Sequence, residues 1–82
     1  MGKVATVFKV YADDGTDPES ILKKIFAEMK PTSMQMEEIG FGIKVIKVMF
    51  VHEDSDGSTE YEKKLMAFQG VKEVEVAEES LL

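Results

Sequence analysis

The chain contains no cysteine, which removes two ways of holding a small protein together. Neither a disulfide framework nor a thiolate metal site is available, so its 82 residues must fold around an apolar core alone. At this length the buried fraction of the surface is already limiting, and we therefore expect a single domain over residues 1–82. The lack of disulfides fits an intracellular protein, and we expect it in the cytoplasm.

Long apolar runs and arginine are missing too. No stretch approaches the ~20 apolar residues that span a bilayer, so we expect no membrane association. The ten basic residues are all lysines, and 16 acidic residues give a net charge of −6. This charge argues against nucleic-acid binding, because such affinity comes largely from neutralising phosphates. It favours a basic partner, or it serves solubility alone, and charge does not decide between the two.

The first half of the chain predicts a strand, a helix and a second strand. Val4–Tyr11 is dense in Val, Thr and Phe, as in a strand with a well-buried face. Thr16–Glu19 then supplies a capping side chain and a first-turn proline for a helix that ends near Lys30. Met34 and Met36 alternate with polar residues, which is typical of a short strand at a sheet edge. The expected buried face of the helix consists of Ile21, Leu22, Ile25, Phe26 and Met29.

The second half repeats the order strand, helix, strand. Ile43–Val51 is apolar at nearly every position and predicts an inner strand. After an acidic turn, Ser58 or Thr59 caps a helix that Gly70 closes. Val74–Ala77 predicts a last strand with an acidic outer face, followed by a short tail over residues 80–82. The helix is expected to bury Tyr61, Leu65 and Phe68.

The element order predicts a ferredoxin-like α+β sandwich. Right-handed crossovers in the two strand-helix-strand units place both helices on one face of a four-stranded antiparallel sheet. The first and third strands are then central. A fold used by so many proteins says little about function, so the functional argument must come from particular residues.

Common catalytic and metal-binding patterns are not matched. His52 is the lone histidine, and we interpret it as a solvated or loosely packed side chain at a strand end, not as a catalytic base. Asp54, Asp56 and Gly57 resemble part of a calcium loop, but a carboxylate is missing at its first position and Lys63 occupies the twelfth. Without a glycine-rich phosphate cradle we expect no direct nucleotide binding. The sequence therefore predicts a non-enzyme without metal or cofactor.

The segment Gly40-Phe41-Gly42 is unusual because glycines flank a large aromatic residue. The glycines leave the backbone free to direct Phe41 away from the sheet, where its ring would suit a pocket on a partner. Alternatively, Phe41 covers the core at a bend and the glycines permit a bulge. Local physics alone slightly favours the second interpretation.

Three features together resemble the exchange domain of translation elongation factor 1-beta. They are the segment Ile39–Lys44, the apolar strand that follows it, and Val51 separated by one residue from Glu53-Asp54. The resemblance extends more weakly to the opening strand and to Val74–Ala77, and the absence of an extra N-terminal region resembles the short archaeal form. It implies a guanine-nucleotide exchange factor that promotes GDP release from elongation factor 1-alpha, the GTPase of polypeptide chain elongation. No covalent bond would be made or broken.

The resemblance also implies a partner-binding surface. The phenylalanine that Phe41 matches contacts the GTPase, and we include its neighbours Gly40, Gly42 and Lys44. The C-terminal end of the domain approaches the magnesium and phosphate site of the partner, which would involve Leu81 and Leu82. Eukaryotic members carry a lysine at the penultimate position, where this chain has leucine, so a lysine lever at that point is absent.

Two other functions are compatible with the expected fold. A small-molecule sensor would bind an amino acid or similar ligand at a helix-strand junction. An RNA-binding module would need aromatic side chains on the exposed face of the sheet within a basic third strand, and that strand here is mostly aliphatic. Neither function explains the segment Gly40–Lys44 as a unit.

Overall fold

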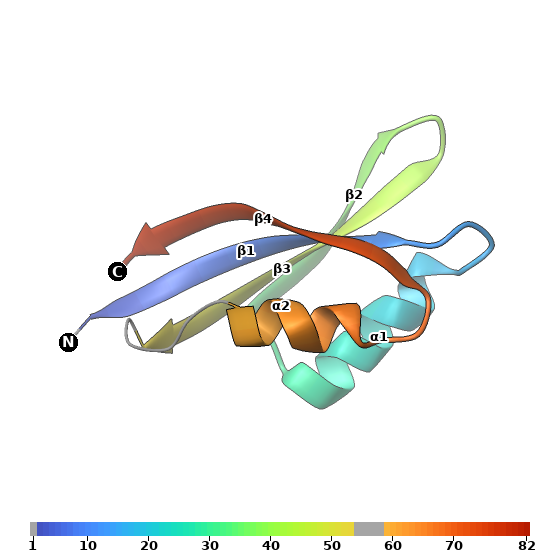
Figure 1. Ribbon diagram of the computed structural model, residues 1–82. Coiled ribbons are helices and arrows are strands. Elements are labelled where there is room, and N and C mark those ends of the chain that lie inside the picture. Colours follow the sequence, from blue (N-terminus) through green and yellow to red (C-terminus); the bar gives the residue numbers. More distant parts are fainter. Residues whose placement is uncertain (1, 54–58) are drawn as a thin grey trace.

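The computed structural model describes residues 2–53 and 59–82, and its elements follow the predicted order. The four strands form one antiparallel sheet in the order β2-β3-β1-β4, with both helices on the same face (Figure 1). The ferredoxin-like fold and the central position of the first and third strands are thereby confirmed. The elements are β1 (Lys3–Ala12), α1 (Pro18–Met29), β2 (Ser33–Gly40), β3 (Ile43–Glu53), α2 (Thr59–Met66) and β4 (Val71–Leu81).

Side chains at alternate positions of the central strands build the core. On β1, Phe8 and Val10 point to the helices and are fully buried, and each pairs with a buried residue of β3. The ring of Phe8 meets Phe50 edge-on at 6.1 Å between centroids. β3 lies between β2 and β1 in the sheet, so the prediction of an inner strand is confirmed. The core cluster consists of Phe8, Val10, Ile21, Ile25, Ile46, Val48, Phe50, Leu65 and Val74.

Capping fixes both ends of α1. The carboxylate oxygen Oδ1 of Asp17 accepts a hydrogen bond from the backbone N–H of Glu19 at 3.0 Å, as predicted for a helix start. At the other end Lys30 adopts the left-handed conformation, with φ of 47°, and its N–H donates to the carbonyl of Phe26. The helix therefore ends where the sequence predicted.

The predicted buried face of α1 is wrong at Phe26. Ile21 and Ile25 are fully buried, whereas the side chain of Phe26 is 63% exposed. Successive residues of a helix turn by about 100°, so Phe26 lies well round the helix from the buried stripe that Ile21 and Ile25 define. The sheet covers this stripe and leaves the flank with Phe26 in solvent.

Three predicted element boundaries need correction. The edge strand β2 runs over eight residues because its whole length pairs with β3, beyond the segment around Met34 and Met36. Helix α2 ends at Met66, and Phe68 packs against the core from the turn that follows. Gly70 has φ of 94° and belongs to that turn, so it does not close the helix directly.

The last strand is longer than predicted. β4 pairs with β1 as far as Leu81, opposite Val4, so Ser80 and Leu81 of the predicted tail belong to the strand. Every residue of the strand after Val74 is exposed, so no buried face marks the extension and backbone pairing with β1 carries it. The acidic turn with Asp54, Asp56 and Gly57, and the proposed cap at Ser58, lie outside the described residues. Within the described ranges, no helix is long and apolar enough to cross a membrane.

Candidate functional site

The hairpin between β2 and β3 has the tightest possible connection. Gly40 pairs with Ile43, so Phe41 and Gly42 alone form the loop, and the register shifts just before it, between Glu38 and Gly40. Both loop residues have positive φ, 54° for Phe41 and 74° for Gly42, as the type I′ hairpin turn requires. A phenylalanine in this conformation costs about 1–2 kcal/mol, because its Cβ crowds the following carbonyl oxygen.

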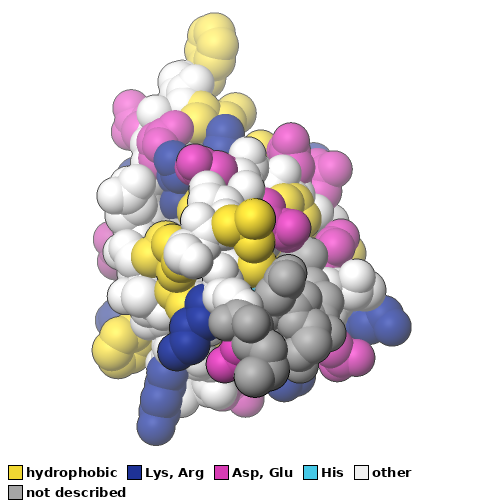
Figure 2. All heavy atoms as spheres, turned by 90° about the vertical axis from the view of Figure 1, so that its left-hand side faces the viewer, with side chains coloured by type: hydrophobic (Ala, Val, Ile, Leu, Met, Phe, Trp, Pro, Cys, Tyr) yellow, Lys and Arg dark blue, Asp and Glu magenta, His cyan; other side chains and the backbone are white. Residues whose placement is uncertain are grey.

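Phe41 lies entirely in solvent. Its relative exposure is 104%, and its two apolar neighbours in the hairpin, Ile39 and Ile43, are about half exposed at 49% and 51%. In Figure 2 an apolar projection stands above the rest of the surface at the end where this hairpin lies. The interpretation of Phe41 as a cover for the core is therefore wrong. Instead, a strained backbone presents a large apolar side chain, which gives the isolated domain no packing in return.

The other predicted residues of the hairpin lie beside Phe41. Gly40 has φ of 110°, a conformation that residues with a Cβ adopt only under strain. Lys44 is exposed on β3 and lies opposite Glu38 of β2. Sequence reasoning missed Ile39 and Ile43, although their symmetric spacing around the glycines was visible. Together Ile39, Phe41 and Ile43 form what we call the hairpin tip.

Leu81 and Leu82 form a second exposed apolar group, which we call the chain end. They are 76% and 71% exposed. Leu81 pairs with Val4 on β1, and the N–H of Leu82 donates to the carbonyl of Lys3 at 2.8 Å. These backbone contacts fix the course of the chain end while its side chains point into solvent.

The structure does not bring the two groups together. The hairpin tip and the chain end lie at opposite ends of the sheet (Figure 1), in a molecule 42 Å long. Leu81 lies opposite Val4, which lies opposite His52, nine residues along β3 from Ile43. At ~3.3 Å per residue the separation is about 30 Å. A partner that contacts both groups must therefore extend along the whole sheet.

His52 is buried, which corrects the prediction of a solvated or loosely packed side chain. It is 7% exposed, and its Nε2 lies 2.9 Å from Oγ1 of Thr6 on β1. Its Nδ1 lies 3.0 Å from the backbone oxygen of Glu53, and Tyr61 of α2 packs against the ring at 5.3 Å. Tyr61 of α2 thus covers this strand end, which the strand pattern alone did not reveal.

The uncovered face of the sheet carries charged and polar side chains. Nζ of Lys47 on β3 lies 3.4 Å from a carboxylate oxygen of Glu37 on β2. The hydroxyl of Tyr11 on β1 donates to Glu75 of β4 at 3.2 Å. Partial burial of the ring, this hydrogen bond, and the negative charges of Glu75 and Glu73 raise the pKa of Tyr11 above its ordinary value of 10.0. Each of these two contacts thus joins side chains of neighbouring strands on the uncovered face.

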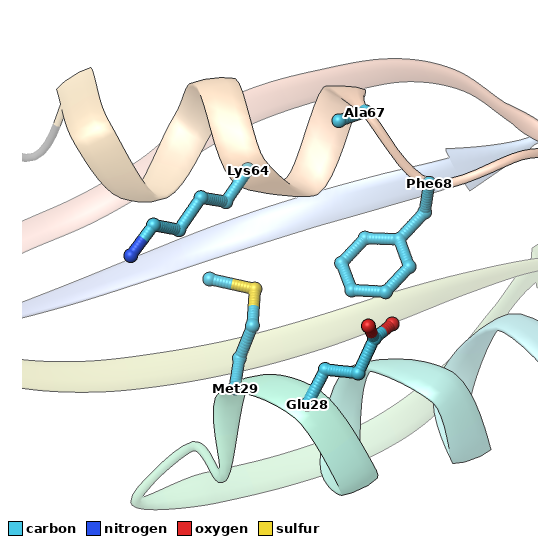
Figure 3. A pocket seen from close by; sticks show the side chains of 5 residues that line it. All are labelled: Glu28, Met29, Lys64, Ala67 and Phe68. Atoms are coloured by element: carbon cyan, nitrogen blue, oxygen red, sulfur yellow. The ribbon is translucent and has the colours of Figure 1, made fainter.

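A groove of about 370 Å³ opens between the two helices (Figure 3). Met29 points up from α1 and the ring of Phe68 points down from the turn after α2. The carboxylate of Glu28 lies below the ring of Phe68, and the amine of Lys64 points away from it. Ala67 completes the lining. The groove lies between the C-terminal ends of the helices, next to the turns that lead into β2 and β4.

A ferredoxin-like domain that presents a strained aromatic hairpin and an apolar chain end has the features of a protein-binding module. Comparison with known proteins is consistent with that class. The model of the EF-1 guanine nucleotide exchange domain matches residues 5–82, and the chain belongs to this family. Its function is therefore guanine nucleotide exchange in translation elongation, as the resemblance of Ile39–Lys44 implied.

The relatives are archaeal proteins of the same size. An elongation factor 1-beta from Aeropyrum pernix is 39% identical over 84 aligned positions, covering 93% of this chain and 92% of the relative. That of Methanosphaerula palustris is 37% identical, with 99% of each chain covered. That of Methanospirillum hungatei is 36% identical, with both chains covered in full. The expected resemblance to the short archaeal form is confirmed.

Proposed function

We propose that residues 1–82 form one exchange domain that binds elongation factor 1-alpha and promotes its release of GDP. The observation that carries this proposal is the hairpin tip, where Phe41 is fully exposed on a backbone with positive φ. Burial of a phenylalanine side chain in a partner's pocket contributes about 1.5–3 kcal/mol. A rigid two-residue loop holds the ring ready, so little ordering entropy is lost on binding.

The chain end is the second contact in this proposal. Leu81 and Leu82 are mostly exposed, about 30 Å from the hairpin tip at ~3.3 Å per strand residue. Contacts at both ends of the sheet would fix the orientation of the domain on the GTPase. Phe41 then acts as an anchor, with Gly40, Gly42 and Lys44 at its side. The chain end approaches the magnesium and phosphate site.

Exchange in this proposal is a binding effect without covalent chemistry. The domain binds the nucleotide-free GTPase more tightly than the GDP-bound form, and linkage requires that GDP binds the complex more weakly by the same factor. A thousandfold weakening corresponds to about 4 kcal/mol of coupling. The domain itself needs no nucleotide, nucleic acid, membrane or cofactor, and acts in the cytoplasm, where chain elongation takes place.

The test measures release of a fluorescent GDP analogue from elongation factor 1-alpha, with and without this protein. The Phe41→Ala variant should slow the stimulated release at least tenfold, equivalent to about 1.4 kcal/mol. The chain offers a matched control, because Phe26 is also exposed, at 63%, but lies on α1. Phe26→Ala should therefore leave the stimulated rate unchanged.

Each outcome has a definite meaning. If the wild-type domain does not accelerate GDP release, exchange on this partner is excluded. If a folded Phe41→Ala variant is as active as wild type, Phe41 is not part of the mechanism. Equal losses in the two variants would indicate a general effect of removing an exposed aromatic ring, and would contradict a specific role of the hairpin tip.

A further inference from the structure

Thr6 and His52 are the two buried polar side chains among residues 2–53 and 59–82. Thr6 is completely buried, at 0% exposure, in the middle of an apolar strand. Burial of a polar group is costly unless it is hydrogen-bonded, and a valine would fit the same space without that requirement. The hydroxyl of Thr6 therefore calls for an explanation beyond packing.

The ring of His52 is oriented by its backbone contact. A carbonyl oxygen only accepts, so Nδ1, 3.0 Å from the backbone oxygen of Glu53, carries a hydrogen and donates it. The other nitrogen, Nε2, lies 2.9 Å from Oγ1 of Thr6. Oγ1 in turn lies 3.4 Å from Oε2 of Glu79 on β4. Because a hydroxyl carries one hydrogen, its donation to Glu79 requires that Nε2 donates to Oγ1, with both ring nitrogens of His52 carrying a hydrogen. The Thr6 hydroxyl thus joins a buried ring on β3 to a carboxylate on β4.

This link reaches the part of β4 that packing holds least. Val74 is the buried residue of the strand, and the side chains of residues 75–81 are all exposed. The register of β4 against β1 also shifts between Val7 and Phe8, before this last segment. Segments with little apolar burial open locally at low free energy. Residues 78–81 therefore depend on backbone pairing and on the bond from Thr6 to Glu79.

We propose that Thr6 is a positioning residue, which holds the chain end in the conformation that the GTPase contacts. Glu79 lies directly opposite Thr6 and two residues before Leu81. His52, fixed by Glu53 and by the ring of Tyr61, orients the hydroxyl, and the hydroxyl holds Glu79. The functional half of this inference rests on the proposed function, because it assumes that Leu81 and Leu82 contact the partner.

The first measurement needs no partner. The Leu82 amide donates to the carbonyl of Lys3, and its hydrogen exchange, followed by NMR, reports opening of the chain end. Loss of a hydrogen bond in Thr6→Val should speed this exchange about fivefold relative to the buried core amides, whose exchange reports global stability. Thr6→Ser keeps the hydroxyl and should remain near the wild-type rate. Equal acceleration in Thr6→Val and Thr6→Ser would overturn the role of the hydroxyl.

A second variant keeps the test decisive if Thr6→Val does not fold. Glu79 is exposed, so Glu79→Ala removes the other partner with little risk to the core. It should speed exchange of the Leu82 amide to a similar degree. When both variants fold, the double variant should open no faster than either single variant, because both remove the same bond. The link between Thr6 and Glu79 would be overturned if the two substitutions multiplied each other's effect on the exchange rate. It would also be overturned if Glu79→Ala left that rate unchanged.

The functional half is tested in the GDP-release assay with wild type and Phe41→Ala run in parallel. Thr6→Val and Glu79→Ala should lower the stimulated rate about threefold, and Thr6→Ser should restore it, since loosening the chain end adds an ordering cost on binding. Thr6→Val and Glu79→Ala could speed hydrogen exchange of the Leu82 amide without slowing GDP release, while Phe41→Ala does slow it. In that case the positioning role of Thr6 is wrong and the proposed function stands. If wild type gives no stimulation, the proposed function itself fails.

Discussion

The ring of Tyr61 on α2 lies against the ring of Phe50 on β3, with 4.7 Å between centroids and 28° between planes. Phe50 also meets Phe8 of β1 edge-on, so three aromatic rings connect the helix to the middle of the sheet. An eight-residue helix is unstable alone in water, and its order depends on tertiary contacts. The stacked pair supplies part of that contact, together with the fully buried side chain of Leu65.

Tyr61→Ala is therefore expected to lower the free energy of unfolding by about 2 kcal/mol, less than for a fully buried ring because Tyr61 is half-buried. Tyr61→Phe keeps the stack and should change stability by less than ~0.5 kcal/mol. Urea unfolding followed by circular dichroism gives both values. A loss of the same size in Tyr61→Phe would show that the hydroxyl, and not the stack, stabilises α2.

Substitution of Phe41 should separate stability from function. Asparagine tolerates the left-handed conformation, and Asn-Gly is the preferred type I′ sequence, so Phe41→Asn should stabilise the domain by about 1 kcal/mol relative to Phe41→Ala. Both variants lose the ring, and both should lose most of the stimulated GDP release. Thermal unfolding and the release assay check the two effects. An Asn variant that is no more stable than the Ala variant would show that the loop stores no strain.

The fold could be predicted from the sequence because local signals agreed with one another. Alternating Val and Phe residues, the Asp17 cap and the glycine turns each predicted an element that the structure contains. Prediction failed where tertiary context decides. Phe26 matches the helical period yet lies beyond the sheet's cover, and β4 continues through exposed residues because β1 offers a free edge to pair with.

The candidate site could be predicted only in part, for a related reason. The glycines around Phe41 indicated an unusual loop, but its direction, into the core or into solvent, depends on two backbone angles that the sequence leaves open. The Thr6–His52 contact joins residues 46 positions apart and depends on the register of two strands. A threonine in a strand and a histidine at a strand end each have ordinary explanations. Their meeting becomes visible only in three dimensions.

Tyr11 should ionise at a higher pH than an ordinary tyrosine. Its pKa lies above 10.0 because partial burial, the bond to Glu75 and the nearby carboxylates disfavour the phenolate. A group whose pKa is raised by folding stabilises the protein below its unfolded pKa, and this contribution is lost as pH rises through the folded value. In a pH titration, the phenolate absorbance of Tyr11 should therefore appear at a higher pH than that of an ordinary tyrosine. Glu75→Gln should lower the pKa of Tyr11, and loss of the signal in Tyr11→Phe assigns the phenolate absorbance to this residue. An unchanged pKa in Glu75→Gln would rule out the carboxylate as a cause of the shift.

The chain end provides the last prediction. Leu81→Ser combined with Leu82→Ser removes two exposed apolar side chains and should leave stability unchanged, because neither packs in the core. Stimulated GDP release should nevertheless fall about tenfold, as expected for the loss of ~1.4 kcal/mol of contact with the GTPase. Val76→Ser is the matched control, since Val76 is 41% exposed on the same strand but further from the end.

Combining the two chain-end substitutions with Phe41→Ala tests whether the GTPase contacts both the chain end and the hairpin tip. Sites about 30 Å apart, at ~3.3 Å per strand residue, share no contacts, so their effects on the transition-state free energy should add and the fold-losses should multiply. The triple variant should therefore release GDP about a hundredfold more slowly than wild type, if each end contributes tenfold. A triple variant no slower than Phe41→Ala would mean that the chain end acts only when the hairpin tip is bound. A chain-end variant as active as wild type would remove Leu81 and Leu82 from the interface and leave the hairpin tip as the contact that drives exchange.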